Sequence, residues 1–177
     1  MHRLFVALRP PAAVRERLAG TMTGVAGARW QDDEQLHLTL RFIGEVEGPV
    51  AEDVALALAG IRAPVVEAQV AGVGMFDRHG RAGVLWAGLT PAAPLAALHH
   101  KIDQALVRVG LAPEGRAYRP HITLARLNAP VAAVERWLAD HAGLRSPLFR
   151  MEAVLLFESH LGSEGARYEA VARVPLG

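Results

Sequence analysis

Apolar and polar residues alternate over several short stretches of the chain with the period of a β-strand. Between 36 and 43 the sequence reads LHLTLRFI, so leucine recurs at every second position of the first part. Successive side chains of a strand point to opposite faces, so this stretch predicts one buried face and one polar face. The stretch 120–127 (PHITLARL) repeats the alternation. We therefore expect strands at 36–43 and 120–127, the first of them ending at Gly44, and a leading strand at Arg3–Leu8.

Longer stretches repeat apolar residues at three- and four-residue intervals, which is the period of an amphipathic helix. In the first of them, Val14 and Leu18 share one helical face after Pro11. The pattern predicts four helices, each close to a proline, because proline is favoured in the first helical turn. They are expected to begin at Pro11, at Gly48-Pro49, at Pro91 or Pro94, and after Asn128-Ala129-Pro130.

Each half of the chain shows the same order of elements, namely helix, alternating strand, helix and two further strands. The further strands are expected in β-rich stretches at Val65–Val73 and Ala82–Leu89, joined by a turn at Phe76–Gly80, and at 148–158 and 167–174. No linker separates the halves. We expect one α+β domain over residues 1–177, with two pseudo-symmetric repeats, roughly 1–90 and 91–177, each an antiparallel sheet with helices.

One pattern, His-x-Thr, occurs in both alternating strands. It reads HLTL from His37 and HITL from His121, so the two copies are 84 residues apart in a chain of 177. His37 and Thr39 share the polar face of the first strand, as His121 and Thr123 do in the second. The duplication indicates two imidazoles and two hydroxyls that face a common space if the strands are neighbours. The alternatives are two structural histidines in a core, and threonines present only for their β-propensity.

The composition narrows the class of protein. Hydrophobic residues make up 51% of the chain, enough for a folded core, and no apolar run is long enough to predict a membrane span. The apolar start meets Arg9-Pro10-Pro11 at once, so we expect no signal peptide. The chain has no cysteine, which excludes disulfides, thiolate metal clusters and a thiol nucleophile. A formal net charge of +1 provides no strong field for a long polyanion. We expect a cytoplasmic protein.

Two histidines and two threonines on facing strands are suited to concerted transfer at phosphorus. Imidazole titrates near pH 6.5, so one ring can hold a proton while its neighbour lacks one. One histidine can take a proton from the attacking oxygen while the other gives a proton to the leaving oxygen. The hydroxyls of Thr39 and Thr123 can donate to the non-bridging phosphate oxygens, so we expect them to bind phosphate. This mechanism needs no metal and no cofactor, and we expect neither.

The remaining histidines and acidic residues do not form a metal-ligand pattern. His99 and His100 are adjacent on a predicted helix, where their side chains point about 100° apart, so we expect them on a solvated surface. Asp32-Asp33-Glu34 lacks ligand spacing and is expected to be a solvated turn. His160 is the further histidine of most interest, because it follows a predicted strand.

Three segments resemble a known family. RLFVALRPP, HLTLRFIGEV and RPHITLAR are similar to the bacterial and archaeal RNA 2′,3′-cyclic phosphodiesterases, also called 2′-5′ RNA ligases, of the two-histidine phosphoesterase superfamily. The resemblance covers essentially the whole chain and implies a bilobal α+β fold with a central active-site cleft lined by both motifs. It also implies hydrolysis of a terminal 2′,3′-cyclic phosphate of RNA to a 2′-phosphomonoester. By resemblance, His37 is the proton donor to the departing 3′ oxygen and His121 is the proton acceptor that activates water. The sequence alone is symmetric and does not decide these roles.

Phe42 and Arg126 also match the family's pattern, and each lies five residues after its motif histidine. A ring and a guanidinium on opposite walls could hold a nucleobase between them by stacking. A regular strand would place both on the face opposite their histidine, so this role requires a twist or a bulge. Otherwise Phe42 is a core residue and Arg126 a surface or phosphate-steering charge. Arg41 has the parity of the histidine face, but its counterpart is Ala125, so a phosphate role there would be one-sided.

The expected partners are RNA ends or nucleotides that bear a 2′,3′-cyclic phosphate, bound by a monomer that does not contact a membrane. The same two histidines could also join RNA ends through a 2′-5′ linkage, by microscopic reversibility. A small cyclic nucleotide is an alternative substrate. From a different class, a non-catalytic nucleotide- or RNA-binding module is an alternative, although a pure binder needs no matched acid and base.

Overall fold

The structure, a computed structural model, describes residues 1–177 and contains nine strands and four α-helices. The strands are β1 (His2–Leu8), β2 (Arg29–Trp30), β3 (Leu38–Val46), β4 (Val66–Arg78), β5 (Arg81–Thr90), β6 (His121–Pro130), β7 (Phe149–Met151), β8 (Ala153–Gly162) and β9 (Gly165–Pro175). The helices are α1 (Ala12–Ala19), α2 (Gly48–Ala59), α3 (Ala92–Arg108) and α4 (Glu135–His141), with 3₁₀ turns η1 (Asp33–Gln35) and η2 (Val131–Ala133).

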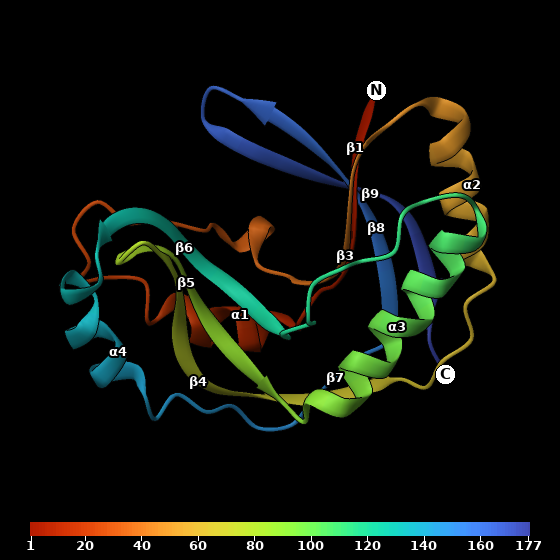
Figure 1. The fold of residues 1–177 in the computed structure, drawn as a ribbon. Coiled ribbons are helices and arrows are strands. Elements are labelled where there is room, and N and C mark those ends of the chain that lie inside the picture. Colours follow the sequence, from red (N-terminus) through yellow and green to blue (C-terminus); the bar gives the residue numbers. More distant parts are fainter.

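The strands form one antiparallel sheet in the order β7-β4-β5-β6-β3-β1-β8-β9, and β2 pairs with β6 (Figure 1). The order is symmetric about the junction of β6 with β3, because β5 and β4 flank β6 as β1 and β8 flank β3. Each lobe takes a hairpin from the other half of the sequence: β5 of the β4–β5 hairpin pairs with β6, and β8 of the β8–β9 hairpin pairs with β1. This exchange joins the two halves through hydrogen bonds, and it explains why no linker separates them.

The two lobes meet where β3 touches β6. The only pair between these strands is Leu38 with Ile122, and both side chains are completely buried. Beyond this pair the strands diverge, with β3 upright and β6 oblique in Figure 1. The junction therefore buries the apolar side of both motifs and opens a space on their other side.

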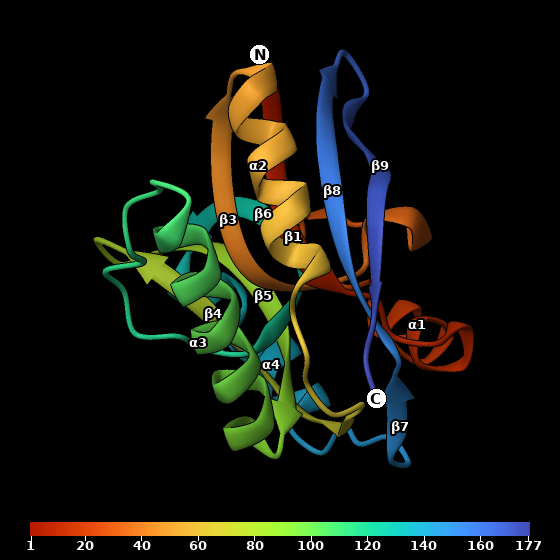
Figure 2. The ribbon, with the colours of Figure 1, turned by 90° about the vertical axis from the view of Figure 1, so that its right-hand side faces the viewer.

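The helices cover one face of the sheet. In the lobe of β1 and β3, α2 and α3 pack on each other and on the strands (Figure 2). In the other lobe α4 contacts β4, and the Trp137 indole of α4 donates a hydrogen bond of 2.9 Å to the Thr21 carbonyl after α1. The main hydrophobic core lies under these helices, whereas Phe5 and Phe157 form a small aromatic cluster on the opposite face. None of the helices combines the length and the apolar content that crossing a membrane requires.

Several predicted boundaries are wrong. The strand at 36–43 does not end at Gly44, because this residue has a φ of +87° and continues β3 with an irregular register. The turn at Phe76–Gly80 is shorter than predicted. Only His79 and Gly80 form it, both with positive φ, as a tight hairpin turn requires. No α-helix begins directly after Asn128-Ala129-Pro130, where only the 3₁₀ turn η2 follows. These residues belong to β6, where Asn128 accepts a 2.6 Å hydrogen bond from Arg81, and α4 starts only at Glu135.

Truncation of Leu38 should destabilise the junction of the lobes. The side chain is completely buried, and Leu→Ala changes at such sites cost about 2–5 kcal/mol through lost burial and a residual cavity. We expect this loss in the free energy of unfolding of Leu38→Ala, measured by urea denaturation. Leu161→Ala is the matched control, since Leu161 is 70% exposed and its truncation should change stability by less than about 0.5 kcal/mol. Equal stability of the two variants would contradict this account of the junction.

Candidate active site

The antiparallel pairing of Leu38 with Ile122 brings the two motifs together. In this register His37 lies across from Thr123, and Thr39 lies across from His121. Because Leu38 and Ile122 point into the core, their four polar neighbours point to the other face. The four residues that the duplication predicts are therefore assembled on one face at the junction.

The His37 ring is held at both nitrogens. Its Nδ1 donates a 2.7 Å hydrogen bond to the Gln35 carbonyl, so the neutral ring carries its proton on Nδ1. Its Nε2 then accepts a 3.0 Å hydrogen bond from the Thr39 hydroxyl. Gln35 is itself fixed, because it closes a capping box with Asp32 and donates to the Ala166 carbonyl at 2.9 Å. Asp32 is thus part of a structured 3₁₀ turn that supports His37.

The His121 ring is held by the same device. Its Nδ1 donates a 2.6 Å hydrogen bond to the carbonyl of Arg119, two residues earlier in the chain. His37 uses the carbonyl of Gln35, also two residues earlier. Both rings therefore share one tautomer and present Nε2 as an acceptor. Sequence reasoning could not find these partners, since a backbone carbonyl has no signature in residue type.

Burial keeps both imidazoles neutral in the free protein. It lowers the pKa of His37 to about 4, and the positive charges of Arg126, Arg9 and His121 add to this effect. Burial also lowers the pKa of His121, with a further contribution from Arg126. The hydrogen bonds from the two Nδ1 atoms oppose the shifts without cancelling them.

Aromatic side chains provide this burial on both sides of the junction. Phe5 lies 4.8 Å from the His37 ring, centroid to centroid, and Tyr168 meets the same ring edge-on at 5.4 Å. Phe76 meets the His121 ring at 4.9 Å with an interplanar angle of 90°. The two histidines thus have equivalent walls, contributed by β1 and β9 in one lobe and by β4 in the other.

A β-bulge occurs at the same position of both motifs. Against β1, Arg41 and Thr39 pair with consecutive residues, so Leu40 is the extra residue. Against β5, Ala125 and Thr123 pair with consecutive residues, so Leu124 is the extra residue. Each bulge reverses the alternation beyond it and turns the residue five positions after the histidine, Phe42 or Arg126, to the histidine face. Phe42 and Arg126 could contact a ligand on the histidine face only if a bulge preceded them. Such a bulge is present in both strands.

Phe42 and Arg126 line different cavities. A cavity of about 480 Å³ beside His121 is lined by Thr39, Phe42 and Phe76, among others. A second cavity, of about 550 Å³, is lined by Arg126, Gln35 and Tyr168, which are close to His37. Because Phe42 and Arg126 share neither cavity, the structure does not support stacking of one base between them. Each side chain instead lies at one end of the site.

Two residues that the sequence analysis did not assign to the site hold the first bulge. The His99 ring of α3 donates a 2.5 Å hydrogen bond to the Leu40 carbonyl and stacks on Tyr118 with a centroid distance of 4.2 Å. The Tyr118 hydroxyl donates to the Thr39 carbonyl at 3.0 Å. The prediction that His99 lies on a solvated surface is therefore wrong. The contact spans 59 residues of sequence, and helical periodicity carries no signal for it.

Arg41 has a structural partner. Its guanidinium is buried and forms an ion pair of 2.7 Å with Asp103 of α3. It also donates to the carbonyl of Ala112, in the loop that precedes the second motif. Asp103 in turn accepts from the backbone amide of Glu114 at 3.0 Å. Arg41 thus anchors this loop to β3, which leaves a phosphate role without support.

Comparisons with known proteins agree with this geometry. The sheet order and the paired motifs define the fold of the two-histidine phosphoesterases, and the predicted α+β bilobal class is confirmed by solved structures. Escherichia coli LigT complexed with 3′-AMP matches with a TM-score of 0.80 and 25% identity, over 99% of this chain and 98% of that one. The Thermus thermophilus protein TT0787 matches with a TM-score of 0.78 and 25% identity, over 98% and 97% of the two chains.

Sequence comparisons then identify the family. The family model described as the 2′-5′ RNA ligase superfamily matches residues 10–162. The RNA 2′,3′-cyclic phosphodiesterase of Aeropyrum pernix is 32% identical over 146 residues, covering 81% of this chain and 83% of its own length. That of Thermus thermophilus is 32% identical over 185 residues, covering 98% and 90%. The chain belongs to the 2′-5′ RNA ligase superfamily.

Burial of neutral His37 should make the fold sensitive to acid. Its pKa is about 4 in the folded chain and about 6.5 for an exposed imidazole, so the folded state binds fewer protons between these values. This contribution to the free energy of unfolding is complete above pH 6.5 and is lost as the pH falls toward 4. When the pH is lowered from 7 to 5, the free energy of unfolding should fall by about 2 kcal/mol less in His37→Gln than in the wild type. Urea denaturation at the two pH values measures this difference.

The matched control for this measurement is His100→Gln, because His100 is exposed on α3. It should lose as much stability between pH 7 and pH 5 as the wild type does. If His37→Gln and the wild type lose the same free energy of unfolding between pH 7 and pH 5, His37 is not held neutral by burial.

Proposed function

We propose that this chain hydrolyses terminal 2′,3′-cyclic phosphates of RNA to 2′-phosphomonoesters, with His37 and His121 as acid and base. The observation that carries the proposal is the matched presentation of Nε2 by two rings at one junction. Membership of a family whose curated relatives are RNA 2′,3′-cyclic phosphodiesterases makes the chain an enzyme of the cyclic phosphodiesterase type. A non-catalytic binding module would need neither the common tautomer nor the duplicated hydrogen bond.

In the proposed reaction, water attacks phosphorus as the bond to the 3′ oxygen breaks. His121 Nε2 accepts the proton of the water, and protonated His37 gives its Nε2 proton to the departing 3′ oxygen. These roles follow the family resemblance. The anionic phosphate between the rings raises the pKa of both and so opposes the effect of burial. The ligand thereby supplies the condition under which His37 can hold a proton.

Protonation of His37 also releases Thr39. In the free protein the Thr39 hydroxyl donates to His37 Nε2. Once Nε2 carries a proton it can no longer accept, so the hydroxyl is free to donate to a non-bridging phosphate oxygen. Thr123, at the equivalent position, is proposed to do the same. Such donors stabilise the charge that these oxygens gain in the transition state.

The cavities suggest how the RNA end is held. The cavity next to His121, at about 480 Å³, is within the usual range of small-molecule sites, and Phe42 provides a stacking surface for the terminal base. Arg126, in the second cavity, is placed to attract phosphate. LigT is a related protein with solved complexes of 3′-AMP and ATP, which supports nucleotide binding by this chain.

Joining of RNA ends through a 2′-5′ linkage is the second candidate, because the same histidines can run the reaction in reverse. The second cavity, of about 550 Å³ next to His37, offers room for the nucleoside that would provide the attacking hydroxyl. Hydrolysis should dominate in dilute solution, where water competes with that hydroxyl. We further propose that residues 1–177 act as one monomeric, cytoplasmic unit with pseudo-repeats near 1–90 and 91–177.

The direct test is incubation with 2′,3′-cyclic AMP in EDTA at 25 °C, followed by identification of the monophosphate isomer. We expect 2′-AMP from the wild type. His37→Ala and His121→Ala should each lose about 10²–10⁴-fold in kcat, because each removes one proton-transfer role. The double variant should be little worse than the worse single variant, since the two act as a unit. His100→Ala should keep full activity, and wild-type turnover by either motif variant would rule out paired catalysis.

The pH dependence should differ between kcat/KM and kcat. The profile of kcat/KM reports the free enzyme, in which burial lowers the pKa of both histidines, His37 to about 4. Its bell should therefore have its maximum below pH 6.5. The profile of kcat reports the complex, where the bound anion raises both pKa values, so that bell should lie at higher pH. Initial rates between pH 4 and 9 test this, and identical flat profiles would contradict catalysis by two imidazoles.

A further inference from the structure

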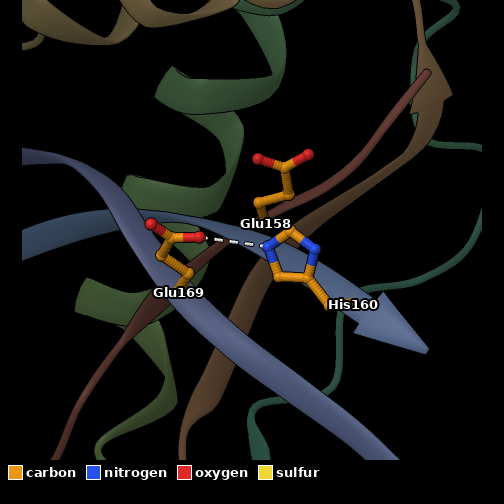
Figure 3. A group of neighbouring side chains, drawn as sticks. All are labelled: Glu158, His160 and Glu169. Carbon is orange, nitrogen blue, oxygen red and sulfur yellow. Dashed lines mark hydrogen bonds and ion pairs between the residues drawn. The ribbon is translucent and has the colours of Figure 1, made fainter. Parts of the chain in front are cut away.

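A second group of ionisable side chains lies on the lobe of β1, β8 and β9, outside the proposed active site. Figure 3 shows Glu158 and His160 of β8 beside Glu169 of β9, and their ligand atoms lie within 4.8 Å of one another. His160 Nε2 is 3.1 Å from a Glu169 carboxylate oxygen. His2 of β1 joins the group, because its Nδ1 is 2.8 Å from a Glu158 carboxylate oxygen. The group thus contains two imidazoles and two carboxylates from three strands.

The strand register places all four on one face. Glu158 pairs with Glu169 across β8 and β9, and His160 shares the face of Glu158 because it is two residues further along. Leu4 of β1 pairs with Glu158, and His2 shares the face of Leu4 because it lies two residues earlier on the same strand. The intervening residues, Phe157 and Tyr168, point the other way and form the wall of His37. The group therefore lies behind that wall.

The charges of this group are not balanced by a permanent cation. Glu158 and Glu169 are directly opposite each other on antiparallel strands, an arrangement in which like charges destabilise a sheet. Each carboxylate forms its ion pair with a histidine, and neither has an arginine or lysine within ion-pair distance. Arg167 pairs with His160 across the strands but contacts neither carboxylate. A cation placed between the carboxylates would remove this repulsion.

We propose that His2, Glu158, His160 and Glu169 bind a divalent transition-metal ion of the zinc type. Zinc takes four nitrogen and oxygen ligands at about 2.0–2.2 Å, which sets tetrahedral ligand atoms about 3.3 Å apart. The two existing contacts, at 2.8 and 3.1 Å, are close to that separation, and the ligand atoms of Glu158, His160 and Glu169 already lie within 4.8 Å of one another. His2 contacts Glu158 and would rotate toward the other two residues to complete the set. Two imidazoles favour a transition metal over calcium or magnesium, which prefer oxygen ligands.

The bound ion would act as a clamp. It would join β1, β8 and β9 on one face of the sheet. Phe157 and Tyr168, the neighbours of Glu158 and Glu169 in sequence, support His37 on the opposite face. The tip of the β8–β9 hairpin and Tyr168 also line the second cavity. The ion therefore stabilises the wall of the site without touching the reacting atoms. The inference does not depend on the proposed reaction, since its first readouts are binding and thermal stability.

The test uses the untagged full chain and zinc chloride, with titration calorimetry and metal analysis after dialysis. We expect one zinc ion per chain. At a free zinc concentration a hundredfold above Kd, the melting temperature should rise by roughly 5–10 °C. EDTA should reverse this rise and leave hydrolysis at 25 °C unchanged. Absence of zinc binding, or binding without any thermal shift, would overturn the proposal.

Variants locate the ion. His160→Ala and Glu169→Gln should each weaken zinc binding at least tenfold, because each removes one ligand from a half-exposed position where the fold tolerates change. His100→Ala is the control for adventitious binding by a surface histidine and should bind as the wild type does. His121→Ala should also retain zinc. Loss of zinc from His121→Ala, or equal affinity in His160→Ala and the wild type, would place the ion elsewhere and refute the site.

Discussion

The antiparallel contact between Leu38 and Ile122 is the constraint on which the rest of the structure depends. It buries two apolar side chains at the only point where the lobes' motif strands pair. Strand alternation then requires the flanking His and Thr residues to face the other way, into one space. The divergence of β3 and β6 beyond this pair keeps that space open. Core packing and site geometry thus have a common origin, and neither could change without the other.

Two local structural features, present in both motifs, fix the orientation of the side chains around this contact. A carbonyl two residues upstream fixes each imidazole in the same tautomer, and a bulge three residues downstream turns Phe42 and Arg126 toward the histidine face. Main-chain atoms provide both features, so neither depends on the identity of a neighbouring side chain. The arrangement leaves the rings neutral and buried, so the charge of a phosphate ligand decides their protonation.

The sequence predicts much of this arrangement because alternation and duplication are local signals. His37, Thr39, His121 and Thr123 could be placed on one face from their spacing alone. The exchange of the β4–β5 and β8–β9 hairpins between the lobes could not, since the pattern of a strand does not identify the strand with which it pairs. The same limit applies to His99, whose partner Leu40 is distant in sequence, and to the false helix start near Asn128, whose side chain bonds to Arg81 on β5. Long-range partners decided each of these cases.

Departures from the two-fold symmetry give the two histidines different chemical properties. Burial lowers the pKa of both rings; at His37 the effects of Arg126, Arg9 and His121 add to burial and the pKa falls to about 4, whereas at His121 Arg126 alone adds to burial. A protonated ring in the first environment is the stronger acid, because its proton is repelled by its neighbours and disfavoured by burial. An acid of that kind transfers its proton readily to a departing alkoxide, and the less depressed ring is the better base toward water. The asymmetry therefore supports the proposed assignment of His37 as donor and His121 as acceptor, which two identical tetrapeptide patterns could never distinguish.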